Sequence, residues 1–205
     1  DSHTNIILIE KDNEILFSKE NQKFNDKIVL NYDELNVADI YEFACLVKID
    51  DIKEVIKRQI DYNSKIANEG IINNYGANIG SVLLKSGNDT ATKAKAMAAA
   101  GSDARMSGCE LPVVINSGSG NQGITITLPI VEYAKALNVS DEKLYRALVL
   151  ANLIAIHQKN GIGRLSAYCG AVSAGCAAGS GIAFLHGGDY QCIAHTLVNY
   201  FGNNL

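Results

Sequence analysis

The sequence predicts an α+β protein that is predominantly α-helical, with a small N-terminal β-rich segment followed by an all-helical body. Short runs of β-branched and apolar residues gather near the start of the chain, at 4–9, 14–17 and 27–30. From residue 36 onward, apolar residues recur mainly at the three- and four-residue spacing of an amphipathic helix. We therefore expect a β-rich leader over 1–34 and a helical, catalytic-type domain over 35–205.

The first two runs, "TNIILI" and "EILF", are separated by "EKDN", which predicts a hairpin with its turn near Asp12-Asn13. The run "KIVL" at 27–30 is a candidate third strand. Asn36 is a plausible N-cap for the first helix. A second, amphipathic helix is predicted within 50–71, where isoleucine and valine recur at helical spacing.

The later part of the chain predicts four more helical regions. An alanine-rich helix is expected within 89–108, and two helices around 130–137 and 141–158, the second beginning at Ser140. Small residues dominate 164–188, which allows close approach of helices or leaves room beside a bound group. A final helix follows Asp189 as its cap and ends near Gly202.

Composition and charge exclude several classes of protein. The 205 residues carry a net charge of −4 and no basic block, so nucleic acid or an acidic membrane surface is not expected as a partner. No stretch reads as a membrane span, and the start of the chain does not resemble a signal peptide. Five scattered cysteines predict no disulfide framework, so we expect a reducing, cytoplasmic location.

A polar, glycine-dense stretch, "NSGSGNQG", lies between the apolar segments "LPVVI" and "ITITLPIV". Glycines permit backbone conformations in which several N–H groups point into one concavity, so the loop is suited to a carboxylate or a phosphate. It is neither a Walker A loop nor a dinucleotide fingerprint. An ordinary flexible loop is the alternative, and the apolar flanks argue against it. The expected donors are the backbone N–H groups of "SGSGNQG", 117–123, and the side chains of Ser117, Ser119 and Asn121.

Three further residues are candidates for chemistry. Arg105 could clamp a carboxylate, or it could be a surface residue paired with Asp103. Cys169 could serve a site or simply be a small buried hydrophobe, and its spacing from Cys176 matches no standard metal motif. His157 could be a base, although a plain surface or core histidine fits as well.

The segments "HTNIILIE", "SDARMSG", "INSGSGNQGITITLP" and "RLSAYCGA" resemble, in this order, the L-cysteine desulfidase family, and the loop is similar to that of iron–sulfur L-serine dehydratases. The resemblance covers essentially the whole chain. It implies a pyridoxal-phosphate-independent lyase that converts L-cysteine or L-serine to pyruvate, ammonia and sulfide or water by β-elimination, using a [4Fe–4S] cluster. By this resemblance Cys169 is a cluster ligand, residues 117–121 hold the substrate carboxylate with help from Arg105, and Lys159 is a candidate for acid–base work.

The resemblance also has departures. Family members are about twice as long and carry "GCTEP" and "CDGAK…C" segments with further cysteines, which this sequence lacks. It therefore implies an internal fragment, with a leader missing its N-terminal portion, a helical domain truncated at the C-terminus, no cluster of its own and no activity. A non-catalytic module that binds an amino acid or carboxylate is the alternative, and phosphate binding is a third. The expected partner is a small amino acid. The choice between cysteine and serine stays open, and so does the oligomeric state, with a homodimer as one option.

Overall fold

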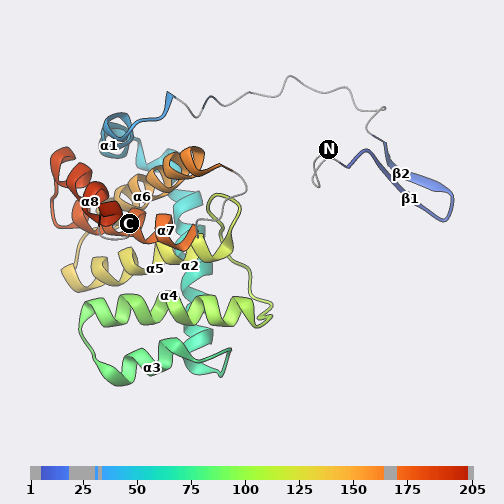
Figure 1. Cartoon of the computed structure of the whole chain (residues 1–205), viewed down its shortest axis with the longest axis horizontal. Coiled ribbons are helices and arrows are strands. Elements are labelled where there is room, and N and C mark those ends of the chain that lie inside the picture. Colours follow the sequence, from blue (N-terminus) through green and yellow to red (C-terminus); the bar gives the residue numbers. More distant parts are fainter. Residues whose placement is uncertain (1–5, 19–30, 32–33, 164–169, 203–205) are drawn as a thin grey trace. The chain divides into compact units, whose positions relative to one another are not determined.

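The structure is a computed structural model that describes residues 6–18, 31, 34–163 and 170–202. These residues fall into two units, a β-hairpin and a helical body, each of which is considered by itself. Eight helices and one two-stranded sheet occur in these ranges, which confirms the predicted mostly helical α+β class (Figure 1). No helix in the described ranges combines the length and apolar character that a membrane crossing requires.

The hairpin has the predicted position and turn. Strand β1, Leu8–Lys11, pairs antiparallel with β2, Glu14–Ser18. The two turn residues, Asp12 and Asn13, have positive φ angles of 51° and 66°, as a two-residue type I′ connection requires. The strand predicted at 27–30 lies outside the described residues.

The helical body begins with a capped helix and a long amphipathic one. Helix α1, Val37–Leu46, starts after Asn36, whose Oδ1 accepts a hydrogen bond from the Asp39 amide at 3.0 Å, so the predicted cap is confirmed. Helix α2 spans Ile49–Ile72. The short α3, Ile79–Ser86, was not predicted. The alanine-rich α4 spans Thr90–Met106.

Four helices complete the body: α5 (Gly120–Leu137), α6 (Asp141–Ile162), α7 (Gly170–Leu185) and α8 (Tyr190–Gly202). Ser140 caps α6 as predicted, since its Oγ accepts from the Lys143 amide. Asp189 likewise accepts from the Cys192 amide at 2.9 Å and begins α8. Within the body, α4 packs between α3 and α5 (Figure 1).

The predicted start of the helix around 130–137 is wrong by about three turns, because α5 begins at Gly120. Ser119 provides the N-cap, with its Oγ accepting from the Gln122 amide at 3.4 Å. The β-branched run "ITIT" favours a strand by propensity, but tertiary packing overrides that preference here. The upstream segment is also less buried than expected, with Ile115 55% exposed.

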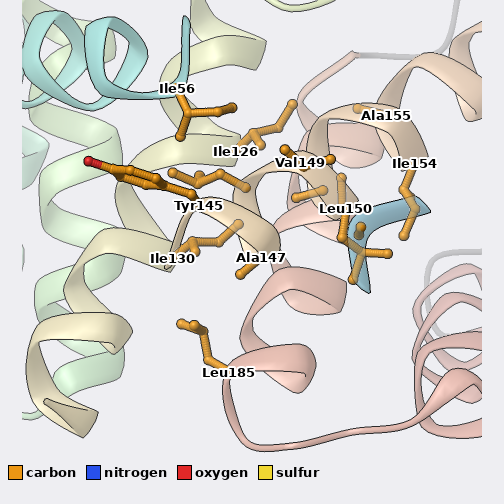
Figure 2. Packing of buried hydrophobic residues seen from close by; sticks show 14 of the residues in the cluster. Ile56, Ile126, Ile130, Tyr145, Ala147, Val149, Leu150, Ile154, Ala155 and Leu185 are labelled. Atoms are coloured by element: carbon orange, nitrogen blue, oxygen red, sulfur yellow. The ribbon is translucent and has the colours of Figure 1, made fainter. Parts of the chain in front are cut away.

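Most of the core lies between α5, α6 and α7, and α1 and α2 pack against it. Ile126 and Ile130 of α5 belong to one buried cluster with Tyr145 and Val149 of α6, whereas Leu150 and Ile154 lie on the side of α6 turned away from α5 (Figure 2). Small residues let the helices approach closely. At Gly181 of α7, a Cβ would collide with the Ile130 side chain. Larger residues there would push α5 and α7 apart.

Contacts between glycines and side chains give the directions of these helices. Gly170 lies against Gln122, and Gly181 lies against Ile130, so α5 and α7 run parallel. Gly120, at the start of α5, lies against Arg105 in the last turn of α4, so α4 runs antiparallel to α5. The N-terminal ends of α5 and α7 therefore lie at one end of the body, together with the C-terminal end of α4.

The direction of α6 follows from two contacts with α7. The Ala147 carbonyl oxygen lies near Gly181, and Gln158 Nε2 donates to Cys176 Sγ at 3.2 Å. Helix α6 therefore runs antiparallel to α7. Its C-terminal turns share the end of the body that holds the glycine-rich loop.

Candidate functional site

The glycine-rich loop forms a closed turn immediately before α5. The Asn116 amide donates to the Ser119 carbonyl at 3.1 Å, and the Ser119 amide donates back to the Asn116 carbonyl at 3.0 Å. Between them, Ser117 and Gly118 have positive φ angles of 49° and 82°. A serine in this left-handed region is uncommon, and such outliers gather at functional sites.

The first residues of α5 supply backbone donors. The N–H groups at the start of an α-helix have no carbonyl partner within the helix, and together with the helix dipole they favour an anion. Gly120 and Asn121 occupy these positions, directly after the turn. Ser117, Ser119 and Asn121 are partly exposed, Gly118 is exposed, and Asn116 and Gly120 are buried.

Arg105 lies directly against this helix end. Its Nη1 donates to Asn121 Oδ1 at 3.2 Å, and the guanidinium covers Gly120 so closely that a Cβ there would collide with it. The alternative partner, Asp103, instead accepts a hydrogen bond from the Ile79 amide at 2.9 Å. The structure thus brings Arg105 together with the predicted anion-binding residues.

Buried amide side chains hold the loop from behind. Asn63 of α2 is fully buried, and its Oδ1 accepts from the Val114 amide at 2.9 Å. Its Nδ2 donates to the Val114 carbonyl at 3.2 Å and to Thr127 Oγ1 at 3.0 Å. Thr127 also accepts from Gln59 and donates to the Gly123 carbonyl. The strand-like segment before the loop is therefore tied to α2 and α5.

A second set of amides ties the turn to α6. Asn116 Nδ2 donates to the Asn152 carbonyl at 3.3 Å and to Asn152 Oδ1 at 2.9 Å. Asn152 Nδ2 in turn donates to the Leu148 carbonyl and to Gln59 Oε1, both at 2.8 Å. Ser117 Oγ donates to Asn116 Oδ1 at 2.7 Å.

These amide residues are not among the predicted site residues, although the sequence carries a signal for them. Gln59 and Asn63 lie four residues apart on the same helical stripe as the buried Ile56 and Ile66. A polar residue on the apolar stripe of an amphipathic helix is buried with it and needs a hydrogen-bond partner.

Gln122 connects the loop to α7. It is only 6% exposed, and its side-chain amide lies over Gly170, where a Cβ would collide with Nε2. Its Oε1 is buried and accepts no hydrogen bond within the described residues. The predicted cluster ligand, Cys169, lies outside the described residues.

Lys159, the predicted acid–base residue, occupies the last turn of α6 and is partly exposed. It follows Asn152 by seven residues, which is about 10 Å along a helix. Within the described part of the chain it forms no hydrogen bond or ion pair with the loop through its side chain. The structure places Lys159 at the same end of the body but does not join it to the anion-binding residues.

The described cysteines do not form a metal site. Cys45, Cys109, Cys176 and Cys192 lie on different elements, and no group of three potential ligands among the described histidine, cysteine and acidic residues could hold a metal ion. Burial raises the pKa of the Cys176 thiol, and a hydrogen bond from Gln158 opposes that shift. The described residues alone therefore do not supply the ligands of an iron–sulfur cluster.

A separate cleft of about 310 Å³ lies near the start of α6, away from the loop, and contains none of the predicted site residues. Arg146 lines it, but this side chain serves the fold. Its Nη1 donates to the carbonyls of Ala44 and Cys45 at 2.9 and 2.7 Å, which closes the C-terminal end of α1.

Comparison with known proteins gives a family match over most of the chain. The model of the family described as serine dehydratase alpha chain matches residues 15–205. A UPF0597 protein of Desulfitobacterium hafniense is 59% identical over 200 residues, which are 97% of this chain and 46% of that protein. A UPF0597 protein of Lachnoclostridium phytofermentans is 55% identical over 98% of this chain and 48% of its own length. A UPF0597 protein of Treponema denticola is 45% identical over 98% of this chain and 48% of its own length.

The chain spans about half the length of these curated relatives. No solved structure matches it.

Proposed function

Because the chain belongs to the serine dehydratase alpha chain family, we propose that it provides the substrate-binding part of a pyridoxal-phosphate-independent lyase acting on L-serine or L-cysteine. The reaction is a β-elimination. A base removes the proton from the α-carbon, hydroxide or hydrosulfide leaves the β-carbon, and the resulting enamine tautomerises and hydrolyses to pyruvate and ammonia.

The observation that supports this proposal is the convergence at the start of α5. Two parallel helices, α5 and α7, direct their N-terminal ends to the same place, and Arg105 adds a full positive charge beside Gly120. Helix N-termini and a guanidinium together favour a carboxylate. We assign the carboxylate of the substrate to the backbone N–H groups of Ser117 and Gly118 and to Ser119, Gly120 and Asn121, with Arg105 as the charged partner.

The chemical roles of the remaining candidates belong to the same proposal. Lys159 is the proposed acid–base residue, and Cys169 is the proposed ligand of a [4Fe–4S] cluster. Such a cluster, when bound, supplies an iron that withdraws charge from the leaving group as a Lewis acid. The described residues lack a ligand set for it, so we assign to them substrate binding and, at Lys159, the acid–base role, but no iron ligand.

Binding can be tested on the chain itself. We expect L-serine and L-cysteine to shift the NMR signals of residues 117–121, whereas L-serine methyl ester, which lacks the carboxylate, does not. Arg105→Met should weaken L-serine binding by about tenfold or more, since a charge-assisted hydrogen bond is lost. The exposed Arg58→Met on α2 serves as the matched control.

Equal shifts from L-serine and its methyl ester would refute the carboxylate assignment. Binding of a sugar phosphate in preference to both amino acids would favour a phosphate site instead. The reaction itself is tested on a chain of the relatives' full length, loaded with iron and sulfide without oxygen. Pyruvate release that is lost in Cys169→Ala supports the lyase, and amino-acid binding without any pyruvate would favour a non-catalytic module.

A further inference from the structure

The two serines of the loop differ in what their hydroxyl groups can offer a ligand. A hydroxyl has one proton to donate. Ser117 Oγ already donates its proton to Asn116 Oδ1 at 2.7 Å, so the Ser117 oxygen can only accept from a ligand. Ser119 Oγ accepts from the Gln122 amide instead, so the proton of Ser119 stays available for a carboxylate.

Backbone carbonyls fix the direction of the Ser117 hydrogen bond. A carbonyl can only accept, so the Asn152 side-chain atom facing the Leu148 carbonyl must be the amide nitrogen. The Asn116 side-chain atom facing the Asn152 carbonyl must be nitrogen for the same reason. The other terminal atom of Asn116 is then an oxygen, and Ser117 has to be the donor.

A second acceptor, in the first turn of α5, also lacks a donor. Gln122 is 94% buried, with 6% of its surface exposed. Within the described residues, no group donates a hydrogen bond to its Oε1. Leaving a buried acceptor without a donor costs about 1–3 kcal/mol, so such atoms require an explanation. The start of α5 therefore combines backbone donors that need an acceptor with side-chain acceptors that need a donor.

We propose that the Ser117 hydroxyl oxygen accepts a hydrogen bond from the α-ammonium group of the substrate and thereby selects an amino acid over the same acid without its amino group. The assignment rests on the proposed function, which places the substrate carboxylate at this loop. The ammonium and the carboxylate of an α-amino acid are attached to one carbon. An acceptor and donors within a single closed turn, 116–119, match that arrangement. Asn116 and Asn152 are positioning residues that keep the Ser117 proton turned away from the ligand.

The test compares L-serine with 3-hydroxypropanoate, which differs only in lacking the amino group. The dissociation constants for both are measured by NMR titration of the unaltered chain and of Ser117→Gly. Glycine suits the positive φ of 49° at this position, so the variant keeps the backbone. We expect the unaltered chain to bind L-serine more tightly than 3-hydroxypropanoate. In Ser117→Gly the ratio of the two dissociation constants should fall about tenfold, which corresponds to the loss of one charged hydrogen bond.

Ser119→Gly is the matched control, the same substitution two residues away. It should weaken both ligands by the same factor, because both carry the carboxylate. Asn116→Ala should lower the preference as Ser117→Gly does, since it frees the Ser117 proton, whereas a general loosening of the loop would weaken both ligands alike.

Two results would overturn the assignment. If Ser117→Gly weakens both ligands equally while the unaltered chain binds them, Ser117 is a carboxylate donor, and the proposed function survives. If the unaltered chain binds neither ligand, the proposed function fails and the role of Ser117 fails with it.

Discussion

Replacing Asn63 with alanine tests whether the buried amides hold the segment before the loop. Asn63 is fully buried and forms three hydrogen bonds, two with the backbone of Val114 and one with Thr127. Each such bond contributes about 1 kcal/mol, so Asn63→Ala should lower the free energy of unfolding by about 3 kcal/mol. For a helical body of this size, that corresponds to a fall in Tm of about 6–12 °C.

The assay is urea and thermal unfolding followed by far-ultraviolet circular dichroism. Asn73→Ala, at the C-cap of the same helix, is the matched control. Asn73 is exposed and donates one hydrogen bond to Glu69 at 2.7 Å, so its loss should cost less than about 0.5 kcal/mol. If Asn63→Ala lowers the free energy of unfolding by no more than Asn73→Ala does, the Asn63 amide does not support the loop. The structural role assigned to the buried amides would then be wrong.

Three further predictions concern packing and protonation. Gly123→Ala should lower the Tm, because its Cβ would collide with the Val114 carbonyl and cost about 1–3 kcal/mol, whereas Gly161→Ala near the end of α6 meets no atom within 4 Å and should raise it. Burial raises the pKa of the Cys176 thiol above the ordinary 9.0, so the folded chain binds this proton more tightly than the unfolded chain. Its contribution to the free energy of unfolding should therefore fall as the pH rises above 9.0, and Cys176→Ala, measured by urea unfolding across that range, should lack this fall. Hydrogen bonds with Cys109 and Glu69 raise the pKa of Tyr75 to about 12, so ultraviolet titration should show a component near 12 that is missing in Tyr75→Phe and shifted toward 10.0 in Cys109→Ala.

The sequence predicted those elements whose signals are local. The turn at Asp12-Asn13 and the caps Asn36, Ser140 and Asp189 depend on the chemistry of a few adjacent residues, and the structure confirms them. The start of α5 was missed because "ITIT" has strand propensity, and only contacts with α2, α4 and α7 make a helix the better choice.

In the candidate site, too, the sequence predicted features that depend on adjacent residues and missed those that depend on packing between helices. Glycine and serine spacing was enough to predict a turn at 117–119, but not that Gly120 and Asn121 belong to α5, nor which residues lie behind the turn. Asn63, Thr127 and Asn152 are far apart in the sequence, and their partnership depends on how α2, α5 and α6 pack. The catalytic role of Lys159 and the metal role of Cys169 stay predictions.

The scaffold behind the loop is built without ionisable groups. Within the described residues, the side chains of this scaffold form hydrogen bonds with one another, with Ser117 and with backbone atoms; they are Gln59, Asn63, Asn116, Thr127 and Asn152. Neutral amides and hydroxyls keep the same hydrogen-bonding capacity from mildly acid to mildly alkaline solution, and salt does not screen them as it screens surface charges. The turn should therefore keep one shape across that range, and any pH dependence of ligand binding should arise from groups outside this scaffold, such as the amino and carboxyl groups of the ligand.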